Sequence, residues 1–307
     1  MTRFIIIRLL QAFVALIGIT VMVFFLVRAS GDPMSLLANP NMTREQYSAI
    51  KERLGLDKSW SEQFLIYMKD ISQGDLGESL VRERHVIDMI KESLPNTLRL
   101  IIPSFIIAML LAFILGIMAA TYRDSLWDNG VKFLAVLGQA LPGFWVGIMA
   151  VLIFSVHLRW LPVAGMSTLA NYVLPVGTMV FFILPGMMRL VRSSMLDVLD
   201  SEYIKMARIK GLPERLVIWK HALRNAVITP LTVAGMIFAM LITGALITET
   251  IFNWPGMGRL LIEGTFARDF PVVQAITVVT AVFVLGINVL VDISYAYIDP
   301  QIRYQKT

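Results

Sequence analysis

The chain has 307 residues, of which 57% are hydrophobic and 16% are charged, and its formal net charge is +5. Soluble domains have about 25% charged residues, so the composition excludes an ordinary water-soluble fold and indicates a membrane protein. The absence of cysteine excludes disulfides, thiolate catalysis and cysteine-bound metals. The basic residues lie beside hydrophobic segments, which favours a role in membrane topology over nucleic-acid binding.

Six apolar segments are long enough to cross a membrane, for which about 20 residues are needed. The first, Phe4–Val27, is preceded by Arg3 and followed by Arg28. Its apolar run exceeds the roughly 7–15 residues of a signal-peptide core, which favours an uncleaved helix over a cleaved signal peptide. The other five predicted spans are Leu98–Thr121, Val131–Val156, Tyr172–Val191, Leu231–Phe252 and Val272–Tyr297.

The segment between the first two spans, Ala29–Asn96, is predicted to form a small helical cap. A capping-box pattern begins at Thr43, and Gly55 is expected to end that helix. A second amphipathic helix is expected from Ser61 to near Gly74. A third is expected over Val86–Ser93, with Pro95 ending it. The aromatic residues of this cap are interpreted as its own core rather than as a ligand site.

Short loops rich in Lys and Arg predict the orientation, because such loops stay in the cytoplasm. The basic stretch after the fourth span falls on one predicted side of the membrane. The other basic residues on that side are Arg3, Arg8, Arg123, Lys132, Arg303 and Lys306. Both termini are therefore expected in the cytoplasm, and the helical cap on the opposite side.

Proline and glycine interrupt the third and fourth spans at Pro142-Gly143, Pro175 and Pro185-Gly186. In lipid, an interrupted helix needs protein or a water-filled cavity to satisfy its freed backbone groups. Two interpretations remain open, namely ordinary kinks in a packed bundle or helices that line a path.

The sequence offers no pattern for catalysis, a metal or a cofactor. It has no phosphate-binding loop and no G-x-S-x-G motif, and its three histidines, His85, His157 and His221, are scattered. Asn288 and Asp292 share one face of the last span. The pair is either an ion site of a secondary transporter or a polar contact between helices. Glu249 lies at the outer end of the fifth span, where we expect water to reach it.

A basic segment follows the fourth span. We expect a helix over Ser201–Lys210, a turn at Gly211, where glycine allows a left-handed conformation, and a second helix from Pro213. This segment is either a solvated loop or a projecting helix that fits a groove on a partner protein. In the second interpretation, Ala207 faces the groove beside basic residues Lys205, Arg208 and Lys210.

This segment resembles the conserved cytoplasmic EAA loop of bacterial ABC-importer permeases, in the form of the oligopeptide, dipeptide and nickel permease family, dipeptide permease B type. The matching residues are Glu202, Tyr203, Ala207, Arg208, Lys210, Gly211 and the run His221–Asn225, which includes Arg224 and Asn225. The general EAA pattern has Glu and Ala where Lys205 and Met206 stand, and this departure favours the peptide type over sugar or amino-acid permeases.

The resemblance extends along nearly the whole chain. Further landmarks in the family's order are Gly31–Pro33, Arg53–Asp57, Gly74–Gly77, Leu94–Leu98, Trp160–Pro162, Glu249–Phe252, Pro255–Gly258, Asp292 and Asp299-Pro300. Each is a weak motif alone, but their shared order and spacing are specific. With this resemblance, Asp292 is interpreted mainly as a structural position of the family.

The resemblance implies an all-α membrane protein with six transmembrane helices in the type I ABC importer permease fold. Residues 1–93 would hold the first helix and the extracytoplasmic helical loop, residues 94–297 the ABC transmembrane domain, and residues 298–307 a cytoplasmic tail. It implies a permease subunit in the bacterial inner membrane that forms half of a path for peptides or a related solute. An ion-coupled transporter using Asn288 and Asp292 is the alternative, and a membrane scaffold without transport is a third reading.

The implied partners are a second, homologous permease subunit, two ABC ATPase subunits, an extracytoplasmic binding protein and the lipid bilayer, and no nucleic acid. ATP hydrolysis would belong to the partners, and alternating access would carry the solute. The segment from Glu202 to Asn225 is expected to contact the ATPases. A gate or binding-protein docking site is expected at Glu249, Phe252, Pro255, Gly256 and Gly258.

Overall fold

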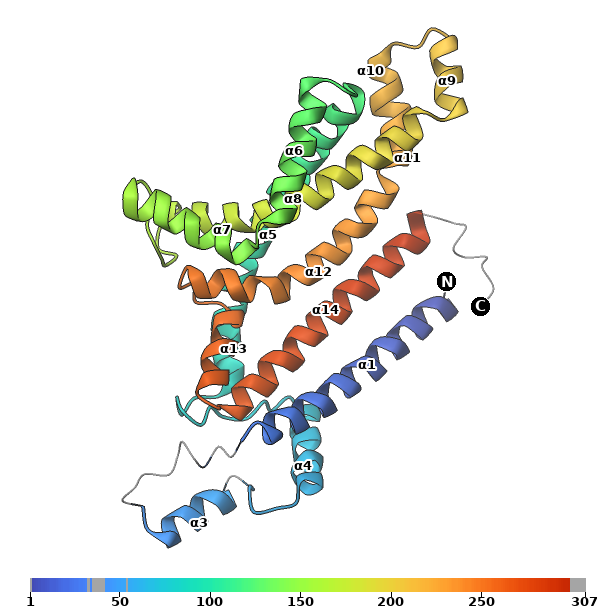
Figure 1. Ribbon diagram of the computed structural model, residues 1–307. Helices are drawn as coiled ribbons and strands as arrows, with labels where there is room; N and C mark the ends of the chain where they lie inside the picture. The colour runs from blue at the N-terminus through green and yellow to red at the C-terminus, as the bar shows by residue number, and fades with distance from the viewer. Residues whose placement is uncertain (1, 32–33, 35–41, 54, 299–307) are drawn as a thin grey trace. The chain divides into compact units, whose positions relative to one another are not determined.

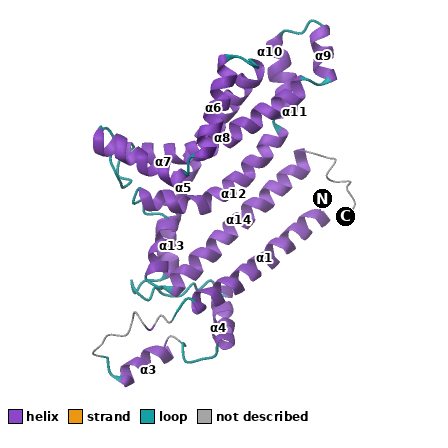
Figure 2. Ribbon diagram, in the orientation of Figure 1, coloured by secondary structure: helices purple, strands orange, loops and turns teal. Residues whose placement is uncertain are grey.

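A computed structural model describes residues 2–31, 34, 42–53 and 55–298. In this part of the chain the regular elements are helices, and the only bridge between extended residues joins Glu78 to His85. Figures 1 and 2 show the helices and the loops that connect them. The predicted motifs at Asp32-Pro33, Leu54 and Asp299-Pro300, and basic residues Arg303 and Lys306, lie outside the described residues.

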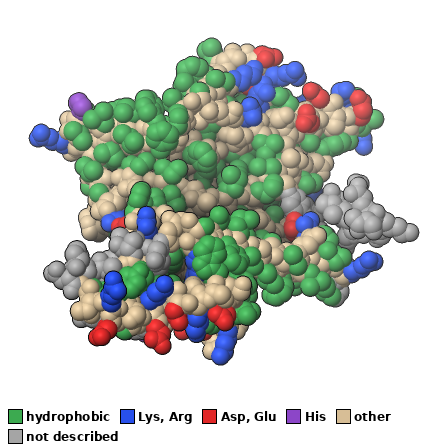
Figure 3. Space-filling model, turned by 60° about the horizontal axis from the view of Figure 1, so that its bottom comes forward, with side chains coloured by type: hydrophobic (Ala, Val, Ile, Leu, Met, Phe, Trp, Pro, Cys, Tyr) green, Lys and Arg blue, Asp and Glu red, His purple; other side chains and the backbone are tan. Residues whose placement is uncertain are grey.

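Within the described residues, five helices are long and apolar enough to cross a membrane. They are α1 (Thr2–Ala29), α5 (Val86–Thr121), α8 (Ala170–Leu199), α12 (Ile228–Ile251) and α14 (Phe270–Ile298). Four of them cover a predicted span completely, whereas α12 begins three residues before its predicted span and ends at Ile251, one residue before the predicted end. Figure 3 shows broad areas of hydrophobic side chains on the surface, with the charged side chains gathered in separate groups, as expected of a chain in lipid.

The third predicted span, Val131–Val156, is bent rather than continuous. It consists of α6 (Leu126–Ala140) and of α7 (Gly143–Ala150) with the π-helix η1 (Val151–His157), and the two parts meet at 98°. Pro142 caps α7 in an extended conformation and has no N–H to continue α6, which explains the break. The pair is a broken span or a re-entrant loop. By contrast, α8 runs through both Pro175 and Pro185.

The helices of the predicted cap differ from the expectation in two places. Between α3 (Arg44–Arg53) and α5 lies α4 (Trp60–Ser72), whose capping box is formed by Ser59 and Glu62, two residues before the expected start. Pro95 does not end a separate helix, because α5 continues from Val86 through it. The first turns of α5 are buried against α13 (Met257–Phe266) and α14, and this packing outweighs the local preference of proline.

The chain divides into two compact units. One contains Leu98–Trp254 and the segment from Ile287, and the other contains Thr2–Thr97 and Pro255–Gly286. In the first unit, α5, α6, α8 and α12 share an apolar core that includes Val131, Met187 and Met188. The helices approach closely there, because a Cβ on Gly138 of α6 would lie 2.1 Å from Cγ of Pro185.

The second unit has a core where α5 meets α13 and α14, with Met89, Leu260 and Ile276 at its centre. In the same unit, α4 packs on the end of α1. The rings of Phe64 and Phe24 meet edge to face at 5.2 Å between centroids. Phe64 and Tyr67 therefore pack on Phe24 of the first span rather than in a core of the cap alone, and Trp60 is 51% exposed.

Candidate functional site

The basic segment forms a helix, a sharp turn and a second helical stretch, as the sequence predicted. It consists of α9 (Glu202–Ile209), α10 (Glu214–Leu216), the π-helix η2 (Val217–Ala222) and α11 (Leu223–Ala226). Gly211 has φ +75°, a left-handed conformation that glycine adopts without strain, and Pro213 caps α10. We call residues 202–226 the helix–turn–helix segment; it stands at the upper right of Figure 1.

The helix–turn–helix segment is anchored through one apolar face of α9. Ile204 and Ala207, three residues apart, pack into a core that includes Met195 of α8 and Val217 and Ala222 of η2. Ala207 is only 8% exposed. The prediction that its side chain faces a partner's groove is therefore wrong, because the Ile204–Ala207 stripe is the face that holds α9 to its own chain.

The opposite face of the segment exposes large apolar side chains. Met206 and Ile209 on α9 are 54% and 79% exposed, and Tyr203 and Trp219 are about half exposed. The basic side chains Lys205, Arg208, Lys210 and Arg224 of the same segment are also exposed. Exposed apolar side chains among exposed charged ones are typical of a surface that binds another protein. Sequence reasoning missed Met206, Ile209 and Trp219, although Tyr203 and Met206 already share the three-residue spacing of a helix face.

Side-chain bonds fix the two limbs of the segment to each other. Asn225 Nδ2 donates to Tyr203 Oη at 2.7 Å, from α11 to α9. Across the turn, the Arg208 guanidinium donates to both carboxylate oxygens of Glu214, at 2.7 and 3.2 Å. This guanidinium lowers the pKa of Glu214, and the carboxylate raises the pKa of Arg208. Within α9, Lys205 Nζ donates to Glu202 at 2.8 Å.

His221, another predicted member of the site, is half-buried in η2, whereas Asn225 is exposed. All ten predicted residues of the segment therefore lie in one substructure. Nine of them are exposed or half-buried, and Ala207 is the buried one.

The second predicted group is mostly buried. Glu249 is fully buried near the end of α12, so the expectation that water reaches it is wrong. The chain folds back over this point: Trp254 N donates to the Glu249 carbonyl oxygen at 2.8 Å, and Trp254 itself is 0% exposed. Phe252 is also buried, and its carbonyl oxygen accepts from Gly165 N at 3.2 Å.

The remaining three residues of that group lie in the second unit, at the start of α13. Gly256 and Gly258 are buried, and Pro255 is exposed. The turn is tied to α5, because Asn96 Nδ2 donates to the Pro255 carbonyl oxygen at 3.0 Å and Met257 N donates to Thr97 Oγ1 at 2.8 Å. The burial of Gly256 and Gly258 indicates that these two glycines have a structural role in this turn.

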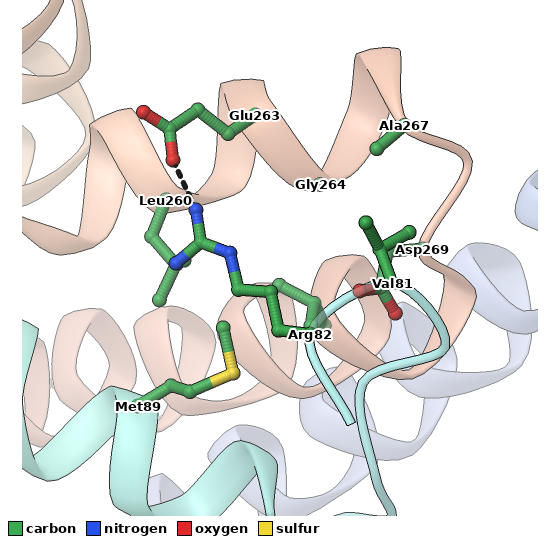
Figure 4. Close-up of a pocket in the computed structure, with 9 residues that line it drawn as sticks. Val81, Arg82, Met89, Leu260, Glu263, Gly264, Ala267 and Asp269 are labelled. Carbon is green, nitrogen blue, oxygen red and sulfur yellow. Dashed lines mark hydrogen bonds and ion pairs between the residues drawn. The ribbon is translucent and has the colours of Figure 1, made fainter. Parts of the chain in front are cut away.

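The second unit also contains a cavity of about 260 Å³ beside α13. Figure 4 shows Met89 and Leu260 on its wall and an ion pair between Arg82 and Glu263 beside it. Asp269 is buried there and accepts from Ser79 Oγ at 2.5 Å and from Leu80 N at 3.1 Å. These bonds hold the loop before α5 against the loop between α13 and α14.

Comparison with protein families gives two matches that together cover most of the chain. Residues 112–304 match the family described as "Binding-protein-dependent transport system inner membrane component". Residues 1–101 match the N-terminal part described as "Binding-prot-dependent transport system membrane comp, N-term". The chain belongs to this family. The predicted inner-membrane location is thereby confirmed.

Curated relatives match this chain along nearly its full length. The chain is 37% identical over 316 residues to "Oligopeptide transport system permease protein AppB" of Bacillus subtilis (strain 168), covering 99% of this chain and 100% of the relative. It is 39% identical over 306 residues to "Glutathione transport system permease protein GsiC" of Salmonella choleraesuis (strain SC-B67), with 99% and 100% coverage. It is also 39% identical over 313 residues to "Putative peptide transport system permease protein BAB2_1050" of Brucella abortus (strain 2308), with the same coverage.

A solved structure supports the fold. "Crystal structure of an amino acid ABC transporter with histidines" matches with a TM-score of 0.56 and 14% identity, covering 69% of this chain and 94% of that chain. The expected all-α membrane fold of an ABC permease and the permease function are confirmed, whereas the number and orientation of the spans stay predictions. The secondary-transporter alternative based on Asn288 and Asp292 finds no support. The family and these relatives are membrane components, which agrees with a chain that is not itself an enzyme.

Proposed function

We propose that this permease subunit forms half of the path of an ATP-driven importer of peptides. The cargo class is supported by the full-length relatives, whose names specify oligopeptides, peptides and glutathione. The other half of the path would come from a second, homologous permease subunit. Two ABC ATPase subunits and an extracytoplasmic binding protein would complete the assembly, and residues 94–297 would be the membrane domain of this half.

The helix–turn–helix segment is proposed as the contact with the ATPases. It would lie in the cytoplasm, in agreement with the predicted orientation of the spans on either side of it, α8 and α12. The observation that carries this proposal is the exposure of Met206 and Ile209 on α9 and of Trp219 on η2, in a basic segment whose other side chains anchor it to its own chain. Burial of such side chains in a partner's groove would stabilise the contact by roughly 1.5–3 kcal/mol for each fully buried side chain. The segment would transmit the closing of the ATPase pair to the membrane helices.

The experiment replaces both Met206 and Ile209 by Asp in the tagged permease and measures how much ATPase subunit co-purifies from membranes. We expect the yield to fall about tenfold or more, because a charge would have to be buried in the contact. Leu126→Asp is the matched control, since Leu126 is 91% exposed and lies outside the segment. A full yield of ATPase with the double variant would refute the assignment of this face.

A docking surface for the binding protein is proposed on the second unit, with its α3 and α4 helices, the exposed Pro255 and the loop before α5. Deletion of residues 43–71 is expected to leave the membrane core inserted and to abolish stimulation of ATP hydrolysis by loaded binding protein. Stimulation that persists at the parent level after this deletion would contradict the docking role.

A further inference from the structure

An ion cluster around one buried carboxylate joins α6 to α8 inside the first unit. Asp128 is fully buried, and its two carboxylate oxygens accept from Nε and Nη2 of Arg192 at 2.5 and 2.9 Å. Lys132, one turn further along α6, brings its Nζ within 2.8 Å of the same carboxylate. We call Asp128, Lys132 and Arg192 the α6–α8 ion cluster.

The cluster lies on the turns of α8 that also anchor the helix–turn–helix segment. One turn before Arg192, Met188 packs in the core shared with Val131 of α6. On either side of Arg192, Val191 and Met195 pack with Ile204 and Val217 of the helix–turn–helix segment. The same stretch of α8 therefore contacts α6 and the proposed ATPase-binding segment.

Two further bonds restrain the start of α6. The Asp128 carboxylate accepts from the backbone N–H of Asp124 at 3.0 Å, which fixes the turn between α5 and α6. From that turn, Arg123 reaches Asp200 at the end of α8, with 3.5 Å between Nη1 and Oδ2. The α5–α6 turn is thus linked to α8 twice, through Asp128 at Arg192 and through Arg123 at Asp200, two residues before α9 begins.

The free energy of burying apolar surface has no preferred direction, so it does not by itself select one rotation of a helix on its neighbour. A two-pronged bond between a guanidinium and a carboxylate is directional, and in a buried site it is difficult to exchange for water. The α6–α8 ion cluster therefore restrains the rotation and the register of α6 on α8. At its other end, α6 leads into the 98° bend and α7.

We propose that Asp128 and Arg192 are positioning residues that make α6 move as one body with α8 and the helix–turn–helix segment. The proposal rests on the proposed function, in which that segment is displaced by the ATPases. When α8 is displaced, α6 would then move by the same amount, because it does not slip on α8. The displacement would reach α7 through α6.

The experiment measures distances between spin labels in the assembled transporter, first without nucleotide and then trapped with ATP and vanadate. The natural absence of cysteine permits labels at Leu126→Cys on α6 and Lys210→Cys at the turn, both of which are exposed. In the parent we expect the same distance in both states. A reference pair, Lys210→Cys with Val282→Cys on α14, reports whether ATP moves the segment at all.

The test variant combines Asp128→Ala with Arg192→Met, which removes the buried carboxylate together with the guanidinium that it pairs with. Lys132 loses Asp128 in this variant, but its side chain is 43% exposed and Asp124 lies 3.7 Å from its Nζ. We expect the 126–210 distance to differ between the two states in this variant, and the amount of peptide transported per ATP to fall. A second variant, Arg192→Lys, keeps the charge but loses the two-pronged bond, and it should give an intermediate result. Lys91→Gln, which breaks an exposed ion pair with Asp88 on α5 in the other unit, should change neither readout.

The outcomes separate the two proposals. A 126–210 distance that changes in the parent, or that stays constant in the test variant with unchanged transport per ATP, would overturn the positioning role alone. A reference pair that does not move with nucleotide in the parent would refute the proposed function, and the positioning role with it. A constant 126–210 distance in the parent that becomes state-dependent in the variant supports the proposal.

Discussion

Asn225 donates a hydrogen bond to the phenol oxygen of Tyr203 across 22 residues of sequence, and this bond ties α11 to α9. We predict that Tyr203→Phe loosens this tie by roughly 0.5–1.5 kcal/mol, the usual net value of one hydrogen bond. Amide hydrogen exchange in α9 should become faster in this variant. Tyr122→Phe is the matched control, because Tyr122 is similarly exposed and lies outside the segment. Equal exchange rates in α9 of the parent and Tyr203→Phe would show that the bond contributes nothing.

The ion pair between Arg208 and Glu214 predicts a pH dependence. Because Arg208 lowers the pKa of Glu214 below its ordinary value of 4.5, the pair stabilises the folded segment above that pH. The stabilisation is lost as the pH falls through the lowered pKa of Glu214. Both side chains are about half exposed, so we expect a contribution below about 1 kcal/mol.

This dependence is measured by comparing the thermal unfolding of the parent with that of Glu214→Gln from pH 7 to pH 3 in detergent. The parent should be the more stable protein at neutral pH, and the difference should close below pH 4.5. A difference that grows as the pH falls would show that the sign is wrong.

Gly138 is predicted to be essential for the packing of α6 on α8. A methyl group in Gly138→Ala would lie 2.1 Å from Cγ of Pro185, so the two helices must separate. We expect a loss of about 1–3 kcal/mol in the free energy of unfolding. Gly130→Ala on the same helix is the matched control, since its Cβ would meet no atom within 4 Å. That control should be neutral or slightly stabilising, and equal stability of the two variants would refute the close approach.

Gly211 is predicted to be needed for its backbone conformation rather than for space. Its φ is +75°, yet a Cβ at this position would meet nothing within 4 Å. Gly211→Ala should therefore cost about 1 kcal/mol through backbone strain at the turn. Gly177→Ala in α8 has equally open surroundings and no positive φ, and it should not destabilise. Unfolding curves of the two variants decide the matter, and an unaffected Gly211→Ala would contradict a strained turn.

Ala207→Asp is predicted to disturb the helix–turn–helix segment itself. The new carboxylate would lie among the apolar side chains of Ile204, Val217 and Ala222, which offer no partner for its charge. A buried unpaired charge of this kind typically costs 3–5 kcal/mol. We expect new protease cleavage sites within residues 202–226, whereas Met206→Asp should leave the segment resistant. Resistance of Ala207→Asp to proteolysis would place its side chain outside the core.

Local sequence patterns were sufficient for the elements whose structure depends on composition and on short-range geometry. Spans such as Leu231–Phe252 follow from the length of the apolar run, because crossing hydrocarbon requires it. The turn at Gly211 followed by Pro213 was also predictable, because the two residues have restricted and complementary backbone preferences. The family resemblance depended on motif order in the same way, and it predicts the helix–turn–helix segment as the site.

Which side of a helix faces its own chain was decided only by the tertiary structure. Ala207 looked like a contact for a partner because it is small and has basic neighbours, yet α8 and η2 cover it. Glu249 looked accessible at the end of its span, but the turn to Trp254 folds back over it. Pro95 looked like a helix end, and packing of α5 on α13 and α14 outweighs that preference. The pairing of Asp128 with Arg192, 64 residues apart, leaves no signal in either local sequence, because burial and long-range contacts depend on segments that only folding brings together.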